Sequence, residues 1–435
     1  MLNLKLELDR SLVPTDREVV RHLIARIGVQ RAQAAPAPAP LDLALVIDAS
    51  GSMAGAPLAA ATAATLELAR TLPDSTRLTV VSFADDVVVH ADGVMLDEAG
   101  RAELLARVGA LSPRGSTNLH AGWRNACSLL LADGEDPRGR TRRVVVLSDG
   151  HANRGLVDPH ALGVESGAQA ERGILSSCIG IGDGYSPQQL AAIAAHGGGE
   201  CHDAADAQEI VEIMRGEVLS FAAIVAEGVE LVIDLPDGVQ ASEDSGLPMT
   251  LGGRRAVLGV GALRAGVERA IAVRLVIPAD APAPTLAAGL EFHAHLEWRD
   301  PGSLVRCSGA VVTVRAQRST ATPPPPGVDA ARTALVAWQA RIVSRATALN
   351  RDGDQLGLEQ LWREEYEPFA AYARHHEATL GFLRTLDAIR ARCDRPMHER
   401  TRRVADDLAR KGSRQSPVYY QRSKGLLFDQ FGDQG

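Results

Sequence analysis

Cysteine is scarce in this chain, and the few residues present show no pairing pattern. There are 5 cysteines among the 435 residues, and none is spaced as CxxC. An odd, sparse set in a chain of this length is typical of proteins in a reducing compartment. We therefore expect a cytoplasmic location and free thiols at Cys127, Cys178, Cys201, Cys307 and Cys393.

Long apolar runs are also missing. The most apolar stretch, 219–235, is interrupted by Glu227, Glu230 and Asp234, whereas a membrane-spanning helix needs roughly 18 uninterrupted residues. The opening MLNLKLELDR alternates charged with apolar residues and lacks the basic region and apolar run of a secretion signal. We expect neither membrane insertion nor secretion.

Common enzyme motifs are not found either. The sequence has no GxxxxGK loop, no HExxH and no nucleophile elbow, and the glycines of GIGDG at 180–184 do not follow the dinucleotide pattern. The absence of these motifs argues against nucleotide binding and against the hydrolase classes that carry them. We predict that the protein is not an enzyme and has no catalytic or nucleotide-binding residues.

The charge is acidic and uneven. The formal net charge is −8, and residues 328–435 hold 18 Lys+Arg against 15 Asp+Glu, which leaves 28 against 39 in residues 1–327. Nucleic-acid or anionic-membrane binding would need a clustered basic surface. We therefore expect no nucleic-acid partner.

What the chain does contain is material for several domains, because about 150 residues per domain is usual. From residue 41 onward, short apolar runs alternate with amphipathic stretches, which predicts a doubly wound α/β domain over 41–216 with ligands at the carboxyl ends of its strands. The expected strands are 41–48, 77–83, 142–149 and 174–182, and the expected helices are 57–71, 97–110, 119–132, 186–196 and 206–219.

After residue 216 the apolar period changes to two, most clearly in LEFHAHLEW at 290–298. This pattern predicts a β-sandwich over 217–318, with further strands at 229–235, 256–263, 269–277 and 304–315. Two strand-like stretches, 2–8 and 19–27, precede the Ala/Pro linker 33–40. We expect residues 1–32 to join the sandwich, which makes the α/β domain an insertion; alternatively, they lie over the α/β domain.

A second Pro-rich linker, 319–327, leads into residues with helical apolar spacing. We predict a helical hairpin or small bundle over 328–411. The tail 412–435 loses this periodicity and is expected to be disordered or to lie as a strap on another surface. The predicted fold is thus a multidomain combination of α/β, β and α parts.

Oxygen-bearing side chains stand where the buried strands end. Asp48, Ser50 and Ser52 follow one apolar run, Thr117 directly precedes a predicted helix, and Asp149 ends another apolar run. The carboxyl ends of parallel strands meet at one edge, so these side chains should lie together. Carboxylate and hydroxyl oxygens suit a small hard cation.

The pattern DASGS at 48–52, followed by Thr117 and by Asp149 of SDG, resembles the metal-ion-dependent adhesion site of von Willebrand factor A (vWA) domains of the bacterial type. The resemblance covers about residues 41–216 and implies a Rossmann-like fold. It also implies that Ser50, Ser52 and Thr117 bind the metal directly, and that Asp48 and Asp149 act directly or through water. Mg²⁺ is the expected ion, with Mn²⁺ or Ca²⁺ as alternatives.

Two carboxylates and three neutral hydroxyls leave a divalent ion electrophilic, with a position open for an Asp or Glu of a partner. We therefore predict a non-enzymatic adaptor that binds a protein partner through the metal. The resemblance suggests AAA-type ATPases or signalling and defence complexes as partner classes. Two alternatives are a metal-dependent hydrolase, and a scaffold that binds through its C-terminal helices while the vWA domain is only structural.

Histidines offer weaker signals. His293 and His295 alternate with Glu291 and Glu297 on the polar face of an expected strand, but no third zinc ligand follows from the spacing. His151 follows Asp149 and could line the rim of the metal site, although a solvent-facing loop residue is the simpler interpretation.

Overall fold

The computed structural model describes most of the chain. The described residues are 2–29, 40–109, 111–132, 139–150, 152–182, 185–204, 207–221, 223–243, 247–281, 289–393, 395–397, 401–402 and 405. Most of the first linker, His151 and the tail 412–435 lie outside these residues, so the expectations for them stay predictions.

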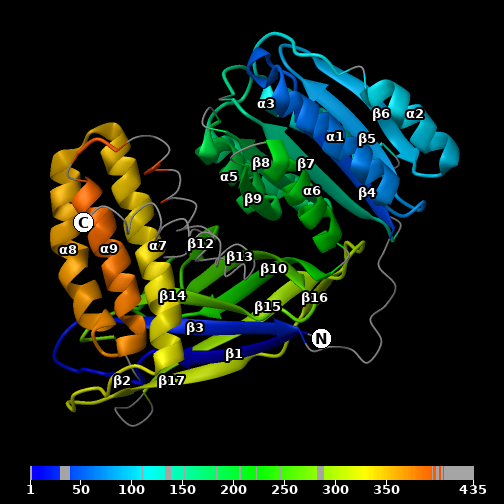
Figure 1. The fold of residues 1–435 in the computed structure, drawn as a ribbon. Coiled ribbons are helices and arrows are strands. Elements are labelled where there is room, and N and C mark those ends of the chain that lie inside the picture. The colour runs from blue at the N-terminus through cyan, green and yellow to red at the C-terminus, as the bar shows by residue number, and fades with distance from the viewer. Residues whose placement is uncertain are drawn as a thin grey trace.

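The described chain forms three parts (Figure 1): a sheet sandwiched by helices, a pair of stacked sheets beneath it, and a group of helices beside the stacked sheets. No helix among the described residues is long and apolar enough to cross a membrane.

The first part is built on a six-stranded sheet with the order β6-β5-β4-β7-β8-β9. All neighbouring strands are parallel except β6, which runs antiparallel to β5. The four central strands are buried along nearly their whole length, because both faces of the sheet are covered. The strands are β4 (Leu41–Asp48), β5 (Arg77–Phe83), β6 (Val87–Met95), β7 (Thr141–Ser148), β8 (Ile174–Ile181) and β9 (Gly198–Ala204).

Helices cover both faces of this sheet and make two separate cores. Side chains of α1, α2 and α6 pack on one face, and those of α3, α4 and α5 pack on the other. This is the doubly wound α/β arrangement predicted from the sequence. The helices are α1 (Ala56–Thr71), α2 (Glu98–Val108), α3 (Leu119–Leu130), α4 (Pro159–Glu171), α5 (Pro187–His196) and α6 (Ala207–Phe221).

Two further sheets, with the orders β1-β3-β14-β11 and β12-β13-β10-β15-β17-β2, enclose one hydrophobic core. β3, which precedes the α/β part, pairs along its length with β14, which follows it. The N-terminal strands therefore do not lie over the α/β part. The strand expected at 304–315 is divided into β16 and β17, both on β15. The strands are β1 (Leu2–Leu8), β2 (Leu12–Val13), β3 (Val19–Val29), β10 (Ile224–Asp234), β11 (Gln240–Glu243), β12 (Met249–Gly252), β13 (Arg255–Arg264), β14 (Arg269–Ile277), β15 (Leu290–Arg299), β16 (Arg306–Ser308) and β17 (Val312–Arg318).

The C-terminal helices α7 (Val328–Asp352), α8 (Gln355–Ala373) and α9 (Leu380–Cys393) pack around a core of their own. Small residues of α7 also pack on Ile24 of β3 and Ala272 of β14. Across the same contact, the hydroxyl of Tyr372 donates a hydrogen bond to Asp9 Oδ2 at 2.9 Å. The helices are thus attached to the outer face of one sheet.

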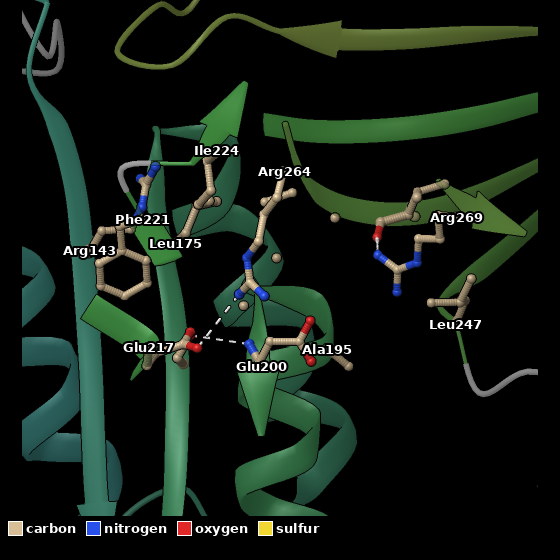
Figure 2. Close-up of a pocket in the computed structure, with 17 residues that line it drawn as sticks. Arg143, Leu175, Ala195, Glu200, Glu217, Phe221, Ile224, Leu247, Arg264 and Arg269 are labelled. Carbon is tan, nitrogen blue, oxygen red and sulfur yellow. Dashed lines mark hydrogen bonds and ion pairs between the residues drawn. The ribbon is translucent and has the colours of Figure 1, made fainter. Parts of the chain in front are cut away.

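Charged side chains join the α/β part to the stacked sheets. Arg143 of β7 forms an ion pair with Glu227 of β10, and both side chains are buried. Glu217 of α6 lies 3.7 Å from Arg264 of β13, and Figure 2 shows this pair facing each other across the junction. The junction therefore combines charged pairs with the apolar packing of Ile224 and Ala262 on the α/β core.

Candidate metal site at the carboxyl ends of the central strands

The five predicted ligands lie at the carboxyl edge of the six-stranded sheet. Asp48 is the last residue of β4, and Asp149 directly follows the neighbouring strand β7. Ser50 and Ser52 lie in the turn between β4 and α1, which contains a short 3-10 helix at Gly51–Met53. Thr117 stands two residues before α3. Because β4 and β7 are parallel neighbours, their ends bring these loops together.

Hydrogen bonds link the hydroxyls to a carboxylate. Ser50 Oγ lies 3.0 Å from Ser52 Oγ, and Ser52 Oγ donates to Asp149 Oδ1 at 2.7 Å. A methyl group placed on Gly150 would lie 3.3 Å from Thr117 Oγ1 and 3.7 Å from Ser52 Oγ. Both hydroxyls thus lie over the same short stretch of backbone, and the structure brings Ser50, Ser52, Thr117 and Asp149 to one place.

Asp48 is the anchor beneath this cluster. Its side chain is fully buried. Its Oδ1 accepts from the backbone N–H of Ser50 at 2.8 Å, and its Oδ2 accepts from Ser148 Oγ at 2.6 Å. Burial raises the pKa of Asp48 above its ordinary value, even though these hydrogen bonds lower it. Burial likewise raises the pKa of Asp149, so a nearby cation would stabilise both charged forms.

The loop that carries Thr117 is held from several sides. The backbone N–H of Arg114 donates to Ala49 at 2.6 Å, and the N–H of Gly51 donates to Gly115 at 3.2 Å. The N–H of Thr117 donates to Asn153 Oδ1 at 3.3 Å. These bonds tie the loops before α1, before α3 and after β7 into one unit.

The donor set fits a small divalent cation. It consists of hard oxygens only, which Mg²⁺ prefers, and Ser52 is exposed while Asp149 is half-buried. No group of three or more His, Cys, Asp or Glu gathers anywhere in the described part of the chain. The predicted ligand set contains two carboxylates, and its other donors are hydroxyl groups.

Sequence reasoning missed three residues beside this cluster. The hydroxyl of Ser116 donates to Asp85, in the turn between β5 and β6, and the same carboxylate lies 3.3 Å from Arg154 Nε. The hydrogen bond from Ser116 is the largest cause of the lowered pKa of Asp85. An Asp-Asp pair in a turn carries no distinctive signal, so only the folded chain shows that Asp85 reaches the Thr117 loop.

The histidines considered for zinc have other neighbours. His293 Nδ1 lies 2.8 Å from Thr313 Oγ1, and His295 Nε2 lies 3.3 Å from Glu297 Oε1. The first contact joins the neighbouring strands β15 and β17, and the second lies within β15. They need no metal to explain them.

A cavity lies at the opposite edge of the α/β sheet. It is lined by Arg143, Glu217 and Arg264 among others, and its volume is about 30 Å³ (Figure 2). That is room for water and no more. Beside it, a groove of about 500 Å³ runs past Trp298 and Arg306. Both include the amino ends of β8 and β9, so neither belongs to the candidate metal site.

Comparison with known proteins shows which family the α/β part matches. The family model for the von Willebrand factor type A domain matches residues 42–215. The uncharacterized protein YfbK of Escherichia coli K12 is 26% identical over 191 residues, which are 43% of this chain and 32% of YfbK. The chain thus spans about a third of that relative's length.

Two solved structures resemble nearly the whole chain. A von Willebrand factor type A protein from Catenulispora acidiphila is 17% identical, with a TM-score of 0.64 and 89% of each chain covered. The ArnB paralog VWA2 from Sulfolobus acidocaldarius is 13% identical, with a TM-score of 0.56 and 95% and 99% coverage of this chain and of VWA2. At these identities the likeness concerns the fold alone. The family match identifies residues 42–215 as a von Willebrand factor type A domain, and the likeness in fold agrees with its Rossmann-like α/β arrangement.

Proposed function

We propose that the vWA domain binds a divalent cation, foremost Mg²⁺, and through it an Asp or Glu side chain of a protein partner. The observation that carries this proposal is the chain of contacts Ser50–Ser52–Asp149, which opens to solvent at the carboxyl edge of the sheet. The role is adhesion rather than catalysis.

Each residue has a distinct part in this proposal. The hydroxyls of Ser50, Ser52 and Thr117 are the direct donors, whereas Asp48 and Asp149 balance the charge directly or through water. Ser148 and the N–H of Ser50 hold Asp48 in place, and Asp149 orients the Ser52 hydroxyl. When bound, the ion supplies an electrophilic centre that attracts a carboxylate.

The biological role that we propose is that of an adaptor in the cytoplasm. A carboxylate contact that depends on one cation gives a specific but reversible attachment. An adaptor of this kind would join an AAA-type ATPase or a signalling or defence complex to a further component. Which of these it serves would follow from the identified partner.

The first test measures cation binding. We expect calorimetric titration with MgCl₂ to show one site in the wild type and none in Ser50→Ala/Ser52→Ala. Because a ligand at about 100 times its Kd stabilises a fold by about 2.7 kcal/mol, MgCl₂ should also raise the Tm of the wild type alone. Ser128→Ala, on the exposed part of α3, is the control and should behave as the wild type. Equal Mg²⁺ affinity in the double variant would refute the ligand assignment.

The second test separates adhesion from hydrolysis. Phosphate-ester and peptide substrates are incubated with the protein in Mg²⁺ or Mn²⁺, and we expect no turnover above that of Asp48→Ala. Turnover that the wild type shows and Asp48→Ala lacks would make the protein a metal-dependent hydrolase instead.

A further inference from the structure

An arginine stands at the rim of the candidate metal site. Arg154 is tied to that place in two independent ways. It follows Asn153, whose Oδ1 accepts the N–H of Thr117 at 3.3 Å. Its own Nε lies 3.3 Å from Asp85 Oδ1, the atom that also accepts the Ser116 hydroxyl.

The guanidinium of Arg154 is engaged through one nitrogen only. Its side chain is 61% exposed, and its ion pair to Asp85 is made through Nε. Arg114, the other arginine of this rim, is different: it is 25% exposed and uses Nε on Asp86 and Nη2 on Ser82. Among the described residues of the rim, Arg154 is therefore the cation that keeps its terminal nitrogens in solvent.

The contact to Asp85 leaves Arg154 able to turn toward a partner. Exposed ion pairs contribute only about 0–1 kcal/mol, and Ser116 continues to satisfy Asp85 when the arginine moves away. The two terminal nitrogens of an arginine form a planar fork that matches a carboxylate in a bidentate manner. A carboxylate is thus the group that this position is suited to bind.

We infer that Arg154 determines the specificity of this edge: the partner presents an acidic peptide segment, with one carboxylate at the cation and a second on the Arg154 guanidinium. This inference rests on the proposed function. It adds that a single acidic residue is not enough for full affinity, and it identifies the side chain that recognises the second one.

The test uses peptide display, because it needs no known partner. A library of disulfide-closed random heptapeptides is selected in MgCl₂ on wild type, on Arg154→Ala and on Ser50→Ala/Ser52→Ala. The matched control is Arg254→Ala, since Arg254 is 65% exposed and paired with Asp237 at 3.2 Å in the stacked sheets, outside the vWA domain. Equal Tm values of the arginine variants and wild type verify that the fold is intact.

We expect wild type and Arg254→Ala to enrich peptides with at least two acidic residues. Arg154→Ala should enrich peptides with one acidic residue and no preference for a second. For a peptide selected on wild type, we expect binding to Arg154→Ala to be about tenfold weaker, as for the loss of a charge-assisted hydrogen bond. Arg154→Lys should restore part of this loss, because lysine keeps the charge without the fork.

Two results would overturn the inference, and they differ. If Arg154→Ala keeps the preference for a second acidic residue while Ser50→Ala/Ser52→Ala selects nothing, the role of Arg154 is wrong and the proposed function stands. If the double serine variant selects the same peptides as wild type, or if wild type selects no peptide that EDTA releases, the proposed function fails and the inference fails with it.

Discussion

Gly115 shows how closely the Thr117 loop is packed at the scale of single residues. A Cβ at this position would lie 1.6 Å from Asp85 Oδ2 and 2.5 Å from its Cγ. A side chain at this position would force the carboxylate that binds Ser116 to move. The glycine thus lets the hydrogen bond between Ser116 and Asp85 form without a steric clash.

We expect Gly115→Ala to displace Asp85 or the loop and to break the hydrogen bond from Ser116, with only a small loss of stability because the Asp85 side chain is 46% exposed. The displacement should also weaken Mg²⁺ binding, because Thr117 lies two residues away. Thermal unfolding and calorimetric Mg²⁺ titration measure the two effects. Gly252→Ala is the control, since nothing lies within 4 Å of its added Cβ. Unchanged Mg²⁺ affinity in Gly115→Ala would mean that the loop does not position Thr117.

The sequence could locate the predicted ligands but not what surrounds them. Asp48, Ser50 and Ser52 lie within one short motif, and Asp149 ends an apolar run, so local patterns place them. The contact of Ser116 with Asp85 spans 31 residues. This contact depends on how the turn between β5 and β6 faces the loop before α3. No local sequence pattern carries that information.

At the scale of elements, strands and helices with a strong apolar signal were predictable, whereas weaker ones, such as β6 and α4, were not. β6 is an edge strand with one buried residue, and His90, Asp92 and Gly93 interrupt its apolar residues. α4 buries Leu162, Gly163 and Ser166, which gives almost no amphipathic pattern. Asp158 followed by Pro159 is a capping signal that could have revealed α4, since Asp158 accepts the N–H of Ala161 at 2.8 Å.

Helix α6 ends the vWA domain with a buried acid. Glu217 is 4% exposed, and its Oε2 lies 3.0 Å from His202 Nε2 of β9. Burial by itself raises the pKa of Glu217, but His202, Ser177 and Arg264 together lower it by more, so its pKa lies below the ordinary 4.5. The charged form is thus the one that the fold stabilises.

A group whose pKa is lowered on folding stabilises the fold above its ordinary pKa and loses this contribution as the pH falls through the folded-state pKa. We expect Glu217→Gln to be less stable than wild type by about 3 kcal/mol at pH 7. The difference should shrink as the pH falls below about 4.5. Denaturant unfolding at pH 7 and pH 3.5 measures it, with Glu359→Gln on the exposed face of α8 as the control. A difference that does not depend on pH would show that the charge of Glu217 is not the cause.

At the scale of the whole molecule, the separation into parts was visible in the sequence, but the way they are joined was not. A Pro-rich linker and a change of apolar period mark where one pattern stops and another begins. Arg143 and Glu227 stand within runs that look like ordinary strands. That they form a buried ion pair between β7 and β10 follows only from the packing of the vWA domain on the stacked sheets.

This pair should make the two parts unfold together. Removing one partner of a buried ion pair costs about 3–5 kcal/mol, because the other charge stays buried without compensation. We expect Glu227→Ala to lower the Tm and to divide a single calorimetric transition into two, of which only one shifts to higher temperature with MgCl₂. The double variant Arg143→Met/Glu227→Leu removes both charges and should regain most of the lost stability. If it is as unstable as Glu227→Ala, the cost comes from lost packing at the junction and not from an uncompensated arginine.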